Sequence, residues 1–583
     1  MRVSKMTDHL KAVFQSNAKF TLNDDLETPQ QYRERWRSIY IIYFTMFLIS
    51  LGFSIIVTGV WPYLDKLDPT AGKEFMGLIV AANPFAQMVF SPIVGWWSNR
   101  LGSIRIPLIM SLVVFALASS TYSSLEVFPS YRKYWMLASR FLVGVSSANI
   151  AACRSYLSAA TRYSERTKAV SMISLAQVLG FVIGPAVQAA VVPLGSEGYP
   201  LLMELRFSMY TASGWINVLL SLLNIYFFFP SMFKEHKIAA KEAMLRMGKD
   251  NVKDTWKEEK INYLAAWTLI VSFFIYVFNF MLLETLATPL TMDQFAWTKS
   301  ESLWYMGLLM SVGAVIAIST FASIAPLSRI VSEVKIMIYG GFLIMVIGCA
   351  CYIPMGSDPP QMYDAEFKLN LTHYCDRFFK NKTTNVDLSN LNTTLWKYGR
   401  WLDPSETNMA AVKYMTLNCG EDLLGCPSSQ EWCAYIPRML LAQFIFAYLF
   451  ITFGYPVGVT IIQTLFSKVL GSKPQGVWMG LITGSGCLSR VMGPIFVTYI
   501  YEEYGTYWTF GATTSIMSLC TIWLLVFQKT LQPAQIRAAN EEDKELKDVK
   551  HFVSVITGEK EKSAGEQHDS SSNGIAQNTC DKT

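Results

Sequence analysis

Four ionisable side chains lie inside long apolar stretches of this 583-residue chain, where charge is rare. A charge at the centre of a membrane helix costs about 2.5–3.5 kcal/mol on insertion scales, so such side chains normally face a cavity or a partner. They are one carboxylate, Glu284, and three guanidinium groups, Arg140, Arg154 and Arg490. The chemistry that they indicate is the binding of a proton or an anion rather than the breaking of covalent bonds.

Each of these groups has a functional and a structural interpretation. A carboxyl group held away from water can bind and release a proton, so we interpret Glu284 as a proton site. Arg140 and Arg490 are predicted to contact an anion in the transport pathway. All three could instead form structural ion pairs between helix bundles, and both alternatives stay open. For Arg154, near the end of its stretch, we expect extension to the membrane surface.

Other kinds of chemistry have no residues to support them. The sequence contains no metal-ligand cluster, no phosphate-binding glycine loop and no nucleophile triad, so we expect no enzyme activity, no metal and no cofactor. The net charge of +5 is small, and no basic patch lies in a soluble segment, which argues against nucleic acid. The expected partners are a small anion or small solute, protons, the lipid bilayer and sorting adaptors.

The composition requires lipid around most of the chain. Hydrophobic residues make up 52% and charged residues only 16%, whereas soluble domains have about 25% charged residues. Apolar stretches of the length that a ~30 Å hydrocarbon core requires recur twelve times. They are 39–60, 76–97, 105–123, 134–156, 168–190, 212–230, 263–288, 303–324, 334–354, 437–466, 476–500 and 508–528. The predicted class is an all-α membrane protein with two bundles of six transmembrane helices.

The domain plan follows from these stretches. A polar tail, 1–38, shows no sign of a cleaved signal peptide. The first bundle covers 39–230, a charged linker covers 231–262, and the second bundle covers 263–528. A tail over 529–583 is charged and then rich in Ser, Asn and Gly, which is typical of disorder.

Charge predicts the orientation, because Lys and Arg concentrate in cytoplasmic connections. If every stretch crosses once, the basic groups fall on one side and the opposite connections are more acidic. The basic side carries Arg33, Arg35, Arg37, Arg100, Arg105, Arg162, Arg166, Lys168 and the eight Lys and Arg residues of the linker. Both termini are therefore predicted to be cytoplasmic.

A long polar loop, 355–436, lies on the non-cytoplasmic side in this plan. It contains three sequons for N-glycosylation, at Asn370, Asn381 and Asn392. It also contains four cysteines, which predict two disulfides in an oxidising compartment with three possible connectivities. They are Cys375, Cys419, Cys426 and Cys433.

The two halves look like a repeat. Trp61-Pro62 ends the first stretch and Thr288-Pro289 ends the seventh, and Met-Gly-Leu opens the second at Met76 and the eighth at Met306. Gly-Pro pairs lie in the fifth and the eleventh. A 6+6 repeat predicts two bundles that face each other across a central cavity. We expect Gly180, Gly184, Pro185, Gly493 and Pro494 to allow close helix packing or bending.

The connection after the second stretch carries a family motif. It reads Gly95-Trp-Trp-Ser-Asn99-Arg100-Leu-Gly102-Ser-Ile-Arg105. It resembles the signature loop of the major facilitator superfamily, Gly-x-x-x-Asp-Arg-x-Gly-x-Arg, with Asn99 in place of the usual Asp. The resemblance implies a cytoplasmic gate in which that side chain faces a helix terminus. An asparagine keeps a hydrogen bond there but has no charge, so we expect a weaker gate.

Longer strings resemble a lysosomal group within the same superfamily, linked to a neuronal ceroid lipofuscinosis. They are RERWRSIYIIYFTMFL, WPYLDKLDPTA, ETLATPLTMDQFAWT and KPQGVWMGLITGSG. The likeness runs from about residue 32 to residue 528 and implies an endolysosomal protein that affects chloride and pH balance. That group carries an acidic dileucine sorting signal in its N-terminal tail, and residues 1–38 here contain none.

The resulting hypothesis is an endolysosomal protein that passes a small anion, with chloride as the expected ion, through the cavity between the bundles. The first alternative is a proton-coupled carrier of a small organic solute, which Glu284 favours. The second is a receptor or scaffold without transport that uses the 355–436 loop.

Overall fold

The computed structural model describes residues 26–68, 71–196, 198–202, 205–363, 425–427 and 430–532. These residues belong to one compact unit, Met1–Leu531, apart from Gln532, which begins the second unit, Gln532–Thr583. Helix dominates the described residues, and the predicted all-α class is confirmed. The described strands form two short pairs, β1 (Tyr199–Leu202) with β2 (Leu205–Phe207), and β3 (Met362–Tyr363) with β4 (Cys426–Pro427).

The described residues of the first half form seven α-helices and two short 3-10 helices, η1 (Leu125–Val127) and η2 (Val192–Leu194). The α-helices are α2 (Pro29–Leu67), α3 (Gly72–Leu101), α4 (Arg105–Ser123), α5 (Arg132–Ser147), α6 (Asn149–Ala160), α7 (Arg166–Val191) and α8 (Thr211–Phe227). Helices α5 and α6 follow one another directly and form a single apolar segment, Arg132–Ala160. The linker then forms α9 (Ile238–Met247) and α10 (Val252–Glu258).

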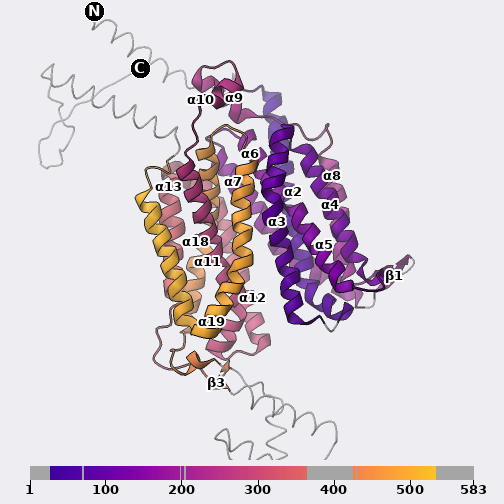
Figure 1. The fold of residues 1–583 in the computed structure, drawn as a ribbon, viewed down its shortest axis with the longest axis vertical. Helices are drawn as coiled ribbons and strands as arrows, with labels where there is room; N and C mark the ends of the chain where they lie inside the picture. Colours follow the sequence, from indigo (N-terminus) through magenta and orange to yellow (C-terminus); the bar gives the residue numbers. More distant parts are fainter. Residues whose placement is uncertain are drawn as a thin grey trace, which may run out of the picture. The chain divides into compact units, whose positions relative to one another are not determined.

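The second half begins with two long helices and ends with the longest. Its elements are α11 (Tyr263–Phe295), α12 (Lys299–Ile330), α13 (Glu333–Lys335), the π-helix η3 (Ile336–Leu343), α14 (Ile344–Cys351), the short η4 (Glu431–Ala434), α18 (Leu441–Leu470) and α19 (Gly476–Val526). In Figure 1, α9 and α10 lie at one end of the long helices, while β1 and β3 lie near the other. We call the first end, where the Lys- and Arg-rich connections also lie, the basic end.

Ten helices of the described residues are long and apolar enough to cross a membrane. Two features account for the difference from twelve predicted crossings. Helix α8 is apolar but has 17 residues, and α19 has 51 residues and is interrupted at Gly505, where φ is 79° and ψ is −171°. Because a residue with a side chain rarely adopts that backbone conformation, glycine divides α19 into the two predicted stretches.

The helices extend beyond the predicted stretches at several ends. Helix α2 begins at Pro29, ten residues before the predicted start at 39, because Thr28 and Gln31 form a capping box there. Helix α12 begins with a second capping box, formed by Thr298 and Glu301. Backbone hydrogen bonds from Thr298 hold the pKa of the Glu301 carboxyl below its usual value.

A buried ion-pair network holds the start of α2 against the connection between α6 and α7. The guanidinium of Arg35 is fully buried and contacts Glu27 at 2.6 Å and Glu165 at 2.9 Å. It also donates a hydrogen bond to the carbonyl oxygen of Ala160, and Arg162 contacts Glu27 at 2.9 Å. Arg35, which the charge pattern assigns to the cytoplasmic side, therefore connects the start of α2 to the α6–α7 connection.

The two halves meet most closely between α3 and α19 at the basic end. Here Gly95 faces Gly476 so closely that a Cβ atom on either would overlap the backbone of the other. The distance between α3 and α19 then increases along α19. A Cβ atom on Gly480 would lie 2.5 Å from the carbonyl oxygen of Ser91, and one on Gly484 would lie 3.1 Å from that of Met88. We call this contact the glycine seam. It shows that the halves diverge away from the basic end, as Figure 1 also shows.

A polar cluster closes the basic end beside the seam. Lys468 of α18 contacts Glu333 of α13 at 2.6 Å and donates a hydrogen bond to the hydroxyl of Thr167 of α7 at 3.2 Å. Thr167 also donates to Glu333. The ring of Tyr163 lies 4.4 Å from the Lys468 ammonium, and burial raises the pKa of that tyrosine. The buried lysine of the second half thus depends on residues of the first.

The Arg35 network predicts a measurable stability effect of Glu27→Gln. Removing one partner of a buried ion pair costs about 3–5 kcal/mol, and the remaining Arg35–Glu165 contact places this substitution at the lower end. Burial opposes the charged form of Glu27, but hydrogen bonds from Arg35 and Arg162 outweigh it and hold the carboxyl pKa below 4.5. The stabilisation is therefore present above pH 4.5 and lost as pH falls through the lowered pKa.

Thermal unfolding of the purified chain in detergent would measure this. We expect a lower Tm for Glu27→Gln at pH 7 and a difference from the unmodified chain that shrinks below about pH 4.5. Glu258→Gln is the control, because Glu258 forms an exposed pair with Lys249. A Tm difference that does not depend on pH would contradict the ionised pair.

Candidate functional site

Two arginines from opposite halves lie close enough for their charges to interact. Arg154 comes from α6 and Arg490 from α19, and the two positive charges act on each other and on the Tyr455 hydroxyl of α18. The guanidinium of Arg154 donates one hydrogen bond, to the Gln177 side chain at 3.3 Å, and its Nε atom is buried without an acceptor. We call Arg154 and Arg490 the arginine pair.

No carboxylate of the described residues lies within 4.0 Å of either guanidinium. Two neighbouring cations in a region of low dielectric repel each other, and each has lost part of its hydration. An anion between them would lower the free energy of both. The arrangement can therefore hold a small anion at the meeting point of the halves.

Glu284 belongs to the same region. Its charge acts on the Tyr455 hydroxyl, as those of the arginine pair do. The ring of Tyr455 stacks on Phe280, one turn before Glu284 on α11, with ring centroids 3.7 Å apart. Glu284 itself is exposed, and it forms no hydrogen bond or ion pair with another described residue. The alternative of an interbundle ion pair is therefore not formed among the residues that the structure describes.

Arg140 lies elsewhere. Its side chain is buried inside the first half, with the guanidinium 5.5 Å from the ring of Phe53 and its charge acting on Tyr122. Its Nη1 atom has no acceptor among the described residues. The structure thus brings together two of the three predicted pathway residues, Glu284 and Arg490, and adds Arg154. The expectation that Arg154 extends to the membrane surface does not hold, because its side chain turns inward to Gln177.

Asn99 of the predicted gate motif crosses between the halves. Its side-chain oxygen accepts a hydrogen bond of 3.0 Å from the backbone N–H of Gly476, the first residue of α19. The first N–H groups of a helix lack partners within the helix and carry partial positive charge, so an acceptor there stabilises the helix start. Asn99 and Gly95 therefore both contact the glycine seam.

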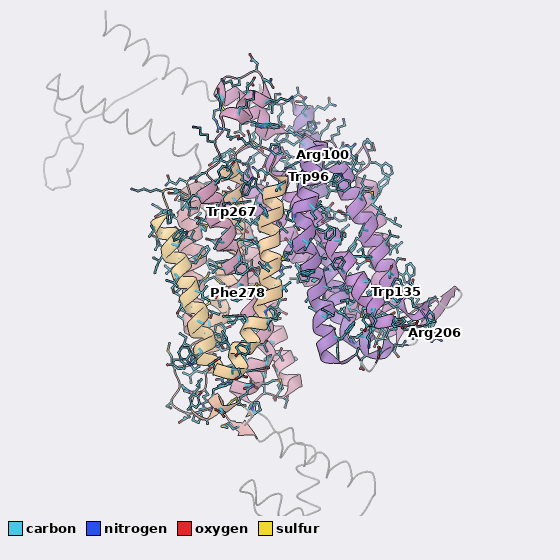
Figure 2. The ribbon with its side chains drawn as sticks, in the orientation of Figure 1. Trp96, Arg100, Trp135, Arg206, Trp267 and Phe278 are labelled. Carbon is cyan, nitrogen blue, oxygen red and sulfur yellow. A yellow bond between two sulfur atoms is a disulfide. The ribbon has the colours of Figure 1, made fainter. Side chains whose placement is uncertain are left out.

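The other motif residues contact side chains of the first half and of the linker. Gly102 ends α3 with a positive φ of 65°, and its carbonyl oxygen accepts a hydrogen bond of 2.7 Å from Lys237. The backbone N–H of Arg105 donates to Glu235 at 3.1 Å. The guanidinium of Arg100 lies over the ring of Trp96, 5.4 Å from its centroid, at the basic end of α3 (Figure 2). These residues shape the turn and attach it to the linker.

The predicted packing glycines lie at close helix contacts. Cβ atoms on Gly180 and Gly184 of α7 would lie 2.5 Å from Phe47 O and Ser54 Cβ of α2. A Cβ atom on Gly493 of α19 would lie 2.9 Å from Met281 of α11. Pro185 and Pro494 follow these glycines inside their helices.

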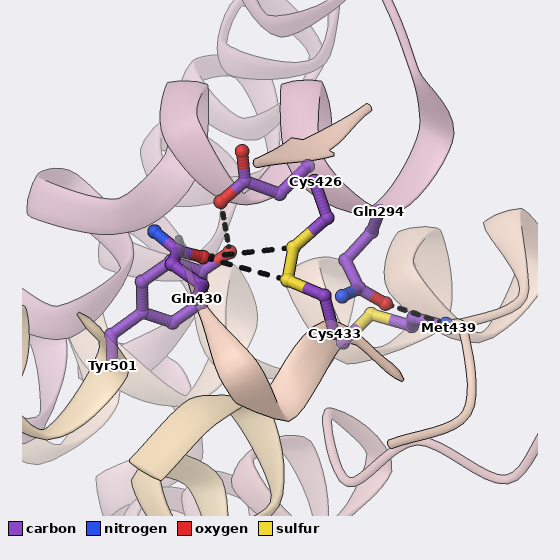
Figure 3. The surroundings of a disulfide bond; sticks show 7 residues. Gln294, Cys426, Gln430, Cys433, Met439 and Tyr501 are labelled. Atoms are coloured by element: carbon purple, nitrogen blue, oxygen red, sulfur yellow. Dashed lines mark hydrogen bonds between the residues drawn. A yellow bond between two sulfur atoms is a disulfide. The ribbon is translucent and has the colours of Figure 1, made fainter. Parts of the chain in front are cut away.

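At the end opposite the basic end, one disulfide joins Cys426 to Cys433 (Figure 3). Residue Trp432, in the same turn, is fully buried against Gly505 at the bend of α19 and against the Tyr501 ring. Tyr501 donates a hydrogen bond of 2.8 Å to Asp293 near the end of α11. The last part of the predicted 355–436 loop is therefore anchored on the second half. Cys375, Cys419 and the sequons at Asn370, Asn381 and Asn392 lie outside the described residues.

Two features of the interface were missed by sequence reasoning. The spacing of Gly476, Gly480 and Gly484 is a small residue at every fourth position, a known signal for close helix contact. The contact of Lys468 with Thr167 of the first half had no such signal, because 301 residues separate its members.

The seam predicts opposite effects of two substitutions at Asn99. Asn99→Asp places a negative charge at the positive end of α19, worth about 0.3–1 kcal/mol, and should favour the closed seam. Asn99→Ala removes the acceptor, at a cost of about 1 kcal/mol. In a Ser91→Cys background, where position 91 is fully buried, thiol labelling from the basic end should be faster with Asn99→Ala and slower with Asn99→Asp. Equal labelling rates would contradict a role for Asn99 in closing the seam.

Comparison with known proteins agrees with this architecture. The family profile described as Major Facilitator Superfamily matches residues 42–364, more than half of the chain. The chain is 35% identical over 517 residues to "Major facilitator superfamily domain-containing protein 8" of Xenopus laevis. This alignment covers 88% of this chain and 95% of that protein.

Solved structures show the same fold at low sequence identity. The crystal structure of the human organic anion transporter MFSD10 is similar with a TM-score of 0.53 and 16% identity, over 85% of this chain and all of that one. The E. coli fucose:proton symporter is similar with a TM-score of 0.54 and 11% identity, over 86% of this chain and all of that one. From the profile and the Xenopus relative together, the chain belongs to the major facilitator superfamily of membrane transporters.

Proposed function

We propose that this transporter passes a small anion, chloride in the first instance, across an endolysosomal membrane, with the arginine pair as the central binding site. The observation that carries the proposal is that Arg154 and Arg490 come from opposite halves, act on each other electrostatically and have no carboxylate partner within 4.0 Å among the described residues. Two like charges in low dielectric are stabilised when an anion binds between them.

The basic end faces the cytoplasm in this proposal, as the distribution of Lys and Arg predicts. The opposite end then faces the lumen, where the loop with its sequons and disulfide would be glycosylated and oxidised. The endolysosomal location comes from the sequence resemblance to a lysosomal group within the superfamily.

The glycine seam and the Lys468 cluster hold the halves together at the basic end, so in this proposal an anion reaches the arginine pair from the opposite, lumenal side. Transport requires the seam to open as the opposite side closes, which is a rigid-body movement of the two halves. Because the arginines belong to different halves, such a movement changes their separation. An anion that contacts both arginines loses the attraction of one of them when the halves separate there, and this loss favours release.

Glu284 supports a second candidate, a proton-coupled carrier of a small solute. It is an exposed carboxylate close to the arginine pair with no ion-pair partner among the described residues. A proton on Glu284 would change the net charge of the site by one unit and so couple proton and anion occupancy.

The anion site predicts that Arg154→Gln and Arg490→Gln each reduce chloride current. A hydrogen bond to a charged group contributes about 1.5–3 kcal/mol, which corresponds to roughly 10- to 150-fold in affinity. The measurement is patch-clamp recording on enlarged endolysosomes, with chloride exchanged for a large impermeant anion. Lys253→Gln removes an exposed positive charge of the linker and serves as the control.

Arg140→Gln completes this comparison, because Arg140 lies inside the first half. We expect it to reduce the current less than Arg154→Gln does. Unchanged currents in both arginine-pair variants, with delivery to the organelle confirmed, would refute the anion site. A strong effect of Arg140→Gln alone would move the pathway into the first half.

The proton-coupled alternative predicts a different result for Glu284→Gln. In vesicles containing the purified chain and a trapped pH indicator, an anion gradient should drive proton movement in the unmodified protein. Glu284→Gln should abolish that movement, because a side-chain amide does not take up a proton. Glu258→Gln, on the exposed linker, is the matched control. Proton movement that persists in Glu284→Gln would exclude Glu284 as the coupling group.

A further inference from the structure

A groove of about 730 Å³ lies at the basic end, away from the arginine pair. One face of α2 forms most of its lining, and the start of α7, the end of α8 and Met232 in the turn after α8 supply the rest. The α2 residues follow two rows at four-residue spacing. The lining consists of Tyr32, Arg33, Trp36, Arg37, Tyr40, Ile41, Phe44, Lys168, Phe227 and Met232.

The groove carries three positive charges and no negative one. Arg33, Arg37 and Lys168 are exposed, and the lining includes no carboxylate. The nearest acidic residues in sequence are engaged elsewhere: Glu34 contacts Lys234 at 2.7 Å, and Glu165 contacts Arg35 at 2.9 Å. The charge of the groove is therefore not neutralised by its surroundings.

The donors in the groove are largely unused. Arg33 and Lys168 form no hydrogen bond or ion pair with another residue that the structure describes. Arg37 donates one hydrogen bond, to the carbonyl oxygen of Ser231 at 3.2 Å, which leaves its other N–H groups available. The indole N–H of Trp36 is buried and has no acceptor within the described residues. The groove thus offers the exposed donors of Arg33, Arg37 and Lys168 to a ligand rich in acceptor oxygens.

The lining changes character along α2. Near the start of the helix it combines cations with Tyr32 and Trp36, whose ring centroids lie 6.2 Å apart. About two turns further on it is apolar, and Phe44 packs edge-to-face on Phe227 with centroids 5.6 Å apart. A ligand that fits both parts has a polar anionic head and an apolar tail.

We propose that this groove binds a phosphoinositide of the cytoplasmic leaflet, with its phosphorylated headgroup on Arg33, Arg37 and Lys168 and its acyl chains along Phe44 and Phe227. Basic pockets between transmembrane helices on the cytoplasmic side are suited to such headgroups. A phosphomonoester carries about −1.5 to −2 charges at pH 7, and the phosphodiester adds one. A monophosphorylated inositol headgroup therefore matches three cations, whereas phosphatidylserine would leave most of them unmatched.

The proposal rests on the cytoplasmic orientation of the basic end but not on the transported substrate. Native mass spectrometry of the full chain, purified in detergent and incubated with defined lipids, tests binding without any measurement of transport. We expect retention of phosphatidylinositol monophosphate in preference to phosphatidylinositol and phosphatidylserine. The double variant Arg33→Gln with Lys168→Gln should weaken that retention about 30-fold, since each cation near an anionic membrane surface contributes close to a factor of five.

The matched control is Lys253→Gln with Lys257→Gln, which removes the same charge from exposed positions of the linker. It should bind the lipid as the unmodified chain does. Equal loss in the two double variants, or equal retention of phosphatidylserine, would overturn the proposal. A soluble inositol phosphate that binds as tightly as the lipid would also overturn it, because the site would then recognise a free phosphate.

Discussion

The contact between α3 and α19 at the basic end determines how the rest of the molecule is arranged. Gly95 and Gly476 allow the two backbones to approach without an intervening side chain, and Asn99 accepts a hydrogen bond from the first residue of α19. Helices in lipid gain little from burying apolar surface against each other, so close backbone packing and polar contacts must hold them together. The seam supplies close backbone packing and a polar contact at the basic end, and the helices lie farther apart at Gly480 and Gly484.

The electrostatic centre depends on that geometry. The seam holds α19 against the first half, and further along α19 the charge of Arg490 acts on Arg154 of α6. Within a single bundle, an arginine can be buried among aromatic rings, as Arg140 is beside Phe53. Between bundles, the two arginines meet without a counterion among the residues that are described. Arg140 also has no carboxylate partner among those residues, so what distinguishes the second site is that two positive charges act on each other there.

The two ends of the second half are stabilised differently. At the basic end, the buried ammonium of Lys468 needs Glu333 and Thr167, so its stability depends on the two halves staying together. At the opposite end, Trp432 and the Cys426–Cys433 bridge hold the return of the 355–436 loop against Gly505 within one half. Opening the basic end breaks polar contacts between the halves. The contacts at the opposite end lie within the second half, so they can move together with it.

The order of helices, the basic end and the family could be predicted from sequence alone. A membrane helix is a local feature, set by about 20 apolar residues in a row, and Lys and Arg mark one side of the bilayer residue by residue. The motif from Gly95 to Arg105 is likewise contiguous. What only the tertiary structure decided is which charges meet. Arg154 and Arg490 are 336 positions apart in the sequence, and the direction of each side chain depends on how its helix is rotated in the bundle. Apolar residues surround Arg140 and Arg154 alike in the sequence, so its pattern could not show that Arg140 is buried beside Phe53 while Arg154 lies where the charge of Arg490 acts on it.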